Sequence, residues 1–112
     1  MNYTKQVLDT AILITVNLSE ASLNQSEEFK NYIYDNSSDT EPKLVIDMSN
    51  IKYMDSSFIG ALVSGLKHVL TKNGEMALVN IQEDVLALFE LTRLDKVFKI
   101  YDSVDDALTN LK

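Results

Sequence analysis

From residue 43 onward, short apolar segments alternate with amphipathic ones, and this alternation is the strongest constraint on the fold. Strands are predicted over residues 43–48, 76–81 and 97–101, and helices over residues 56–72, 83–91 and 103–111. Strands that alternate with helices indicate a mostly parallel sheet with right-handed crossovers. The continuous apolar centre of residues 43–48 is typical of a strand inside a sheet, covered on both faces.

The first 42 residues are predicted to add a hairpin and one more helix. Residues 4–8 and 11–16 read as two strands, and Asp9-Thr10 supplies the turn between them. Residues 22–34 form an amphipathic pattern whose apolar face is expected to hold Leu23, Phe29 and Ile33. We therefore expect one α/β domain over residues 1–112. Its sheet is mixed and mostly parallel, with four or five strands, and about four helices flank it mainly on one face.

Composition excludes several classes of function. Ten basic against 17 acidic residues give a net charge of -7, which disfavours nucleic acid and anionic membrane surfaces as partners. Without cysteine, and with His68 as the one histidine, neither a thiolate nor a multi-histidine metal site can form. No apolar run resembles a signal peptide or a membrane span. We expect a cytoplasmic domain with no metal and no cofactor.

The charge is unevenly spread along the chain. Residues 1–42 hold seven acids and two bases, a net of -5, whereas residues 43–100 hold seven of each. The acidic first helix and its loops are therefore a candidate contact surface for a basic patch on a partner.

The start of the helix over residues 56–72 carries the chemistry of interest. Asp55-Ser56-Ser57 stands where a helix leaves its first N–H groups unsatisfied, and a phosphate attached to a serine there finds donors. The same cluster also reads as an ordinary N-cap. Phe58, in the first turn, is expected to be exposed or held by a partner.

Small residues within this helix predict a face that another backbone can approach closely. They are Ser57, Gly60, Ala61, Ser64, Gly65 and His68. At the far end, Asn73-Gly74 is expected to stop the helix, with Gly74 in a left-handed conformation. In the loop before the helix, Ile51, Tyr53 and Met54 are expected to pack inward.

Three blocks of sequence together resemble the STAS domain, named for sulfate transporters and anti-sigma factor antagonists. They are LVIDMSNIKYMDSS-x-x-G (residues 44–60), NGEMALVNI (73–81) and LFELTRLDKVFKIYDS (88–103). The group that the chain resembles most is the stand-alone bacterial anti-sigma factor antagonists. The resemblance covers residues 43–110 well, and the first 42 residues in outline.

The resemblance implies partner switching in transcription regulation, as in bacterial stress responses. The unmodified protein binds an anti-sigma factor, a serine kinase of the histidine-kinase-like ATPase fold, and thereby frees a sigma factor. The kinase phosphorylates Ser56, with Ser57 the less favoured acceptor, and a serine phosphatase reverses the mark. The implied partner-binding residues are Asp55, Ser57, Phe58, Ile59, Gly60, Ser64, Glu20 and Ser22.

Two departures from the family pattern keep an alternative open. Phe58 stands where the family motif has its first glycine, and Ser19-Glu20-Ala21-Ser22 lacks the glycine and the aspartate of the matching segment. The alternative is a non-switching scaffold subunit of a stressosome-like particle or of a lipid-transport ABC complex. An enzyme that uses Asp55 and Ser56 is disfavoured because no base accompanies them.

Overall fold

A computed structural model describes residues 1–111, so the last residue of the predicted domain, 112, lies outside the described part. The elements are β1 (Tyr3–Val7), β2 (Ile12–Val16), β3 (Glu20–Ala21), α1 (Leu23–Asp35), β4 (Lys43–Asp47), β5 (Tyr53–Met54), α2 (Ser56–Thr71), β6 (Glu75–Val79), α3 (Glu83–Leu91), the 3₁₀ helix η1 (Leu94–Lys96), β7 (Lys99–Tyr101) and α4 (Val104–Asn110). The predicted order of elements is confirmed. The short strands β3 and β5 and the helix η1 were not predicted.

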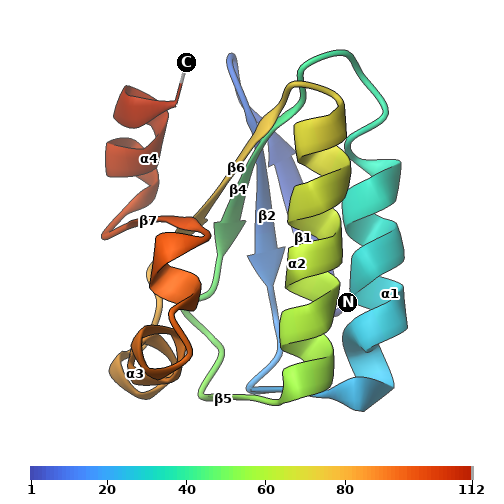
Figure 1. Cartoon of the computed structure of the whole chain (residues 1–112). Helices are drawn as coiled ribbons and strands as arrows, with labels where there is room; N and C mark the ends of the chain where they lie inside the picture. The colour runs from blue at the N-terminus through green and yellow to red at the C-terminus, as the bar shows by residue number, and fades with distance from the viewer. Residues whose placement is uncertain (112) are drawn as a thin grey trace.

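The main sheet has five strands in the order β1-β2-β4-β6-β7 (Figure 1). The β1–β2 hairpin is antiparallel, and the three other pairings are parallel. The mixed, mostly parallel sheet is therefore confirmed. β3 and β5 form a separate parallel pair, in which Glu20 lies opposite Tyr53 and Ala21 opposite Met54.

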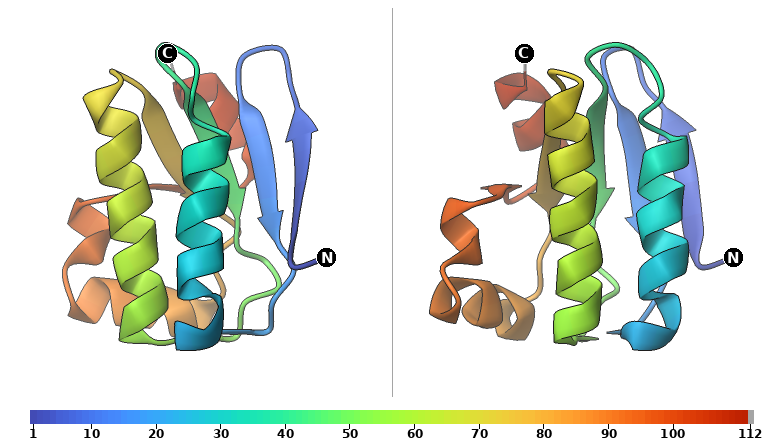
Figure 2. Two further views of the ribbon diagram at one scale, coloured as in Figure 1. Left: turned by 90° about the vertical axis from the view of Figure 1, so that its right-hand side faces the viewer. Right: turned by 45° about the vertical axis from the view of Figure 1, so that its right-hand side comes forward.

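The helices lie mainly on one face of the sheet. α1 and α2 run side by side in the same direction across it, with their N-termini at the same end of the molecule (Figures 1 and 2). α4 packs on the opposite face, where Ala107 joins Val45, Ala77 and Val79 in a small cluster. β4 is thus covered on both faces, as its apolar centre predicts.

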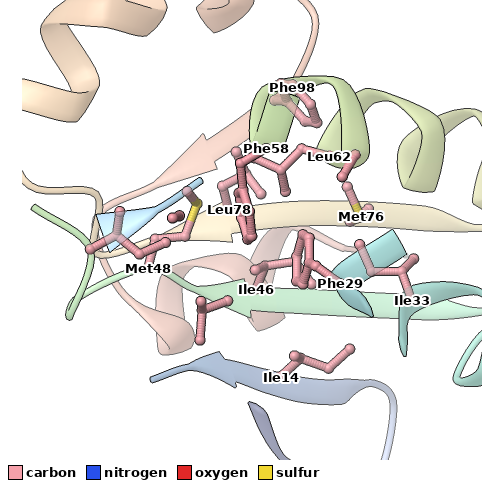
Figure 3. Packing of buried hydrophobic residues seen from close by; sticks show 14 of the residues in the cluster. Ile14, Phe29, Ile33, Ile46, Met48, Phe58, Leu62, Met76, Leu78 and Phe98 are labelled. Atoms are coloured by element: carbon pink, nitrogen blue, oxygen red, sulfur yellow. The ribbon is translucent and has the colours of Figure 1, made fainter. Parts of the chain in front are cut away.

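The main core fills the space between the sheet and the helices α1 and α2 (Figure 3). Ile14, Ile46 and Leu78 point into it from the sheet, and Phe29, Ile33, Phe58 and Leu62 come from the two helices. Val85 and Phe89 of α3 belong to the same cluster. Burial of large apolar side chains of this kind contributes about 1.5–3 kcal/mol for each side chain.

Phe58 is a correction to the sequence analysis. Its side chain is 0% exposed and stacks on Phe29, with 4.6 Å between the ring centroids. The Phe58 ring of α2 and the Phe29 ring of α1 together fill the core space between the two helices and the sheet. Phe58 therefore holds α2 against α1 and is not an exposed contact residue.

Two apolar side chains that were expected to pack inward, Leu23 and Tyr53, are exposed, and Leu70 is exposed as well. Leu23 is 66% exposed at the start of α1, Tyr53 is 56% exposed in β5, and Leu70 is 55% exposed near the end of α2. Tyr53 and Met54 are consecutive residues of an extended segment, so their side chains point to opposite sides, and Met54 takes the inward position.

The turn after α2 also differs from the prediction. Asn73, with φ of 60°, takes the left-handed conformation, and no glycine of residues 1–111 has positive φ. Gly74 serves another purpose, because a Cβ there would clash with the carbonyl oxygen of Pro42. Asparagine tolerates positive φ better than most residues, which leaves the glycine free for this close approach.

Among residues 1–111, no helix combines the length and the apolar character that a membrane span requires.

Candidate functional site

The candidate site lies where α1 and α2 begin. Ser56 is the first residue of α2 and has an exposed side chain, and the side chain of Ser57 is half-buried. Within residues 1–111, neither hydroxyl has a hydrogen-bond partner. The N–H groups of both serines, in the first turn of the helix, point toward the same end of the molecule.

Asp55 joins the two helices. Its Oδ1 accepts a hydrogen bond from the N–H of Phe58 at 2.9 Å and so caps α2. Its Oδ2 accepts a hydrogen bond from the N–H of Leu23, the first residue of α1, also at 2.9 Å. One carboxylate therefore serves two helix N-termini, each with a partial positive charge.

The pairing of β3 with β5 brings the segment before α1 next to the segment before α2. The N–H of Asp55 donates to the carbonyl of Ala21 at 3.0 Å, and the N–H of Lys52 donates to that of Ser19 at 2.8 Å. Glu20 and Ser22 are thereby placed beside the Asp55-Ser56 turn. The Ser22 hydroxyl donates to Oε1 of Gln25 at 3.0 Å, so it already has a hydrogen-bond partner at the N-terminus of α1.

A shallow groove runs between the first halves of the two helices. It is lined by Ser26, Glu27 and Lys30 of α1 and by Ser57, Gly60, Ala61 and Ser64 of α2. Lys30 and Glu27 form an ion pair of 3.3 Å at its edge. Gly60 is exposed, and a Cβ added to it would meet nothing within 4 Å. The groove therefore brings together Ser57, Gly60 and Ser64 of the predicted set.

The small-residue face of α2 has two uses. Its groove side is open, but a Cβ on Gly65 would approach Cδ1 of Ile33 to 2.7 Å. Ile33 belongs to α1, so Gly65 packs against a side chain of the same chain, whereas the sequence analysis expected the close approach of another backbone. Ile59, another predicted contact, is half-buried and packs against the core.

Leu23 and Tyr53 are exposed residues of the site that sequence reasoning placed in the core. The backbone of Leu23 is bonded to Asp55, and Tyr53 lies opposite Glu20 in the short strand pair. The spacing of Leu23 could have indicated its exposure. It lies six residues before Phe29, which places it about 240° around the helix from that buried residue. These two side chains give the site an apolar component.

The side chains of the remaining candidate residues, His68 and Asp47, make contacts that stabilise the fold. His68 stacks on Tyr34 at 4.2 Å between ring centroids, in the last turn of α2 and far from Ser56. Oδ1 of Asp47 accepts hydrogen bonds from the N–H of Ser49 and from Nδ2 of Asn80, the role of a turn residue. In the described part of the chain, no group of three or more His, Cys, Asp or Glu side chains is arranged to hold a metal ion.

Comparison with known proteins identifies the family to which this fold belongs. The family model described as "STAS domain" matches residues 4–107, and the chain belongs to that family. A Thermotoga maritima protein that is provisionally named an anti-sigma factor antagonist is 27% identical over 108 residues, which cover 96% of this chain and 95% of that protein.

Two solved structures show the same fold. An anti-sigma factor antagonist from Mycobacterium paratuberculosis has a TM-score of 0.84 at 25% identity, covering 97% of this chain and 92% of that one. The Bacillus cell fate determinant SpoIIAA in its phosphorylated form has a TM-score of 0.69 at 15% identity, covering 96% of each chain. These findings confirm the α/β STAS fold, and family membership confirms the expectation of a regulator that is not an enzyme.

Proposed function

We propose that this protein is an anti-sigma factor antagonist whose binding to an anti-sigma factor is switched off by phosphorylation of Ser56. The observation that carries the proposal is the exposed, unpartnered Ser56 side chain at the start of α2, beside the groove between α1 and α2. The contact face comprises Ser57, Gly60, Ser64, Glu20, Ser22, Leu23 and Tyr53, with Asp55 holding its two halves together.

The physical chemistry of this position supports a switch. A phosphate adds a charge of about -1.5 to -2 and three strong acceptor oxygens. In the free protein, the N-terminus of α2 and the surrounding water accommodate that charge. In a complex, the phosphate would be desolvated against the partner, and the exclusion of water would strengthen its repulsion from the neighbouring Asp55. The modification therefore breaks a complex without unfolding the domain.

The proposed partners follow from the family. The anti-sigma factor is a serine kinase of the histidine-kinase-like ATPase fold. It transfers the γ-phosphoryl group of ATP to the Ser56 oxygen and releases ADP. A serine phosphatase hydrolyses the phosphoserine and restores the binding form. The setting is the bacterial cytoplasm, and the output is the release of a sigma factor, for instance in a stress response. SpoIIAA, which shares the fold, exists in a phosphorylated form, and this supports a phosphorylated state here.

The test begins with partners copurified from the native host. The copurified kinase-fold partner is incubated with this protein and ATP, and the modified residue is located by mass spectrometry. We expect one phosphate on Ser56, which is lost in Ser56→Ala and kept in Ser57→Ala. Absence of the phosphate, or its placement away from these two serines, would contradict the switch.

A scaffold role is the second candidate, and the segment before α1 favours it. Glu20 and Ser22 lie beside Ser56, but Ser22 occupies the place of the family's aspartate, and its hydroxyl is bonded to Gln25. Copurification with a membrane transporter or a large particle, and without a kinase-fold protein, would support the scaffold and contradict the switch.

A further inference from the structure

We propose that Asp55 is the positioning residue of the Ser56 switch: its carboxylate holds the start of α1 against the start of α2, and a phosphate on Ser56 releases that hold at Leu23. The inference rests on the proposed function, because it assumes that Ser56 is the modified residue. It adds that the modification changes α1 as well as α2.

The starting point is the double use of one carboxylate. Asp55 accepts one N–H from each helix, both at 2.9 Å, and it directly precedes Ser56. The bond to Leu23 joins residues that are 32 positions apart, whereas the bond to Phe58 is local. Hydrogen bonds to a charged acceptor are about twice as strong as neutral ones, so this bond is a substantial tie between the helices.

A phosphate on Ser56 changes the hydrogen-bond acceptors at the N-termini of α1 and α2 in different ways. In the described part of the chain, the N–H groups of Ser56 and Ser57 have no acceptor, and a phosphate on Ser56 supplies one to α2. The phosphate also repels the neighbouring carboxylate, as like charges do. Displacement of the carboxylate removes the acceptor of both Phe58 and Leu23. The phosphate can replace it within the first turn of α2, to which it is attached, whereas the N–H of Leu23 is left without an acceptor.

Movement at Leu23 changes the proposed contact face. Leu23 is largely exposed, and Glu20 lies three residues earlier in the same segment. The capping contact between Ser22 and Gln25 is internal to α1 and does not involve Asp55. Release at Leu23 therefore loosens the first turn of α1, while the body of the helix stays folded and the β3–β5 pairing still holds the preceding segment.

The experiment follows the backbone amides of Leu23 and Phe58 by NMR hydrogen exchange. It uses the full chain with phosphoserine introduced at position 56 during translation, and it needs no kinase. We expect exchange at Leu23 to become faster by about tenfold, the change that follows from losing one hydrogen bond to a charged group. Exchange at Phe58 is expected to change less. Equal protection of Leu23 with and without the phosphate would overturn the proposal.

Two variants separate positioning from a general structural role. Asp55→Asn keeps a good N-cap for α2 but replaces one acceptor oxygen by an N–H donor. It should speed exchange at Leu23 without a phosphate, and added phosphoserine should then have no further effect there. Gln25→Ala weakens the other cap of α1 and should leave the phosphoserine effect intact. An effect that persists in Asp55→Asn would contradict the proposal. Failure of the native kinase to modify Ser56 would contradict the proposed function and leave this result standing.

Discussion

At the scale of single residues, Gly60 and Gly65 of α2 have opposite surroundings. Gly65 faces Ile33 so closely that a methyl group has no room, whereas Gly60 opens onto the groove with free space around it. Glycine inside a helix costs about 0.5–1 kcal/mol relative to alanine. At Gly65 that cost is offset by the close packing of two helices. At Gly60 packing within the chain offers no such compensation, in keeping with a role in contact with a partner.

The two glycines form a matched pair of variants. Gly65→Ala should lower the free energy of unfolding by about 1–3 kcal/mol, because the methyl group forces Ile33 from its position. Gly60→Ala should raise it by about 0.5–1 kcal/mol through helix propensity, while weakening partner binding. Urea unfolding and calorimetric binding measure the two effects. Equal stability changes at both positions would contradict the packing described for α1 and α2.

Phe58 was assigned from the sequence to the contact face because the family motif has a glycine there. Sequence alone does not show that Phe29 of α1 stacks on it, since the two residues are 29 positions apart and meet only in the folded chain. Phe58→Ala should lower the free energy of unfolding by about 3–5 kcal/mol, as loss of a buried aromatic ring does. Phe58→Leu should lose less stability and keep partner affinity. A Phe58→Leu protein that remains folded but no longer binds would restore Phe58 to the contact face.

At the scale of elements, the β3–β5 pair and the Asp55 carboxylate assemble the site. The long strands and helices were predictable because their apolar periodicity extends over several turns or alternations. The two-residue strands carry no such pattern, and their pairing depends on backbone hydrogen bonds between distant segments. For this reason, the Asp55-Ser56-Ser57 turn was recognised from the sequence, whereas the exposure of Leu23 and Tyr53 beside it was not.

Leu23 and Tyr53 provide a test of this surface. Leu23→Ser and Tyr53→Ser should each change the free energy of unfolding by no more than about 0.5 kcal/mol, as exposed substitutions usually do. Each should also weaken binding to the copurified partner several-fold, because exposed apolar anchors beside the switch become buried in the complex. Leu70→Ser is the control, an exposed leucine at the other end of α2. Equal affinities for all three variants and the unmodified chain would place the contact face elsewhere.

At the scale of the whole molecule, the fold separates stability from switching. The sheet is covered by α1 and α2 on one face and by α4 on the other, and the core lies between these layers. Ser56 stands at the end of the helical layer, outside both hydrophobic clusters. A charge added there changes the surface and leaves the core intact. The architecture was predictable from the alternation of strands and helices, but the direct tie between the two helix starts was not, because it depends on one side chain.

The measurement that tests the account most directly is the affinity of the copurified anti-sigma partner for this protein with and without phosphoserine at position 56. Calorimetry gives the dissociation constant, and thermal unfolding of the two free forms shows whether the domain stays folded. The account predicts at least about tenfold weaker binding of the phosphorylated form, corresponding to about 1.4 kcal/mol, with a similar unfolding temperature. Equal dissociation constants for the two folded forms would contradict a switch at Ser56.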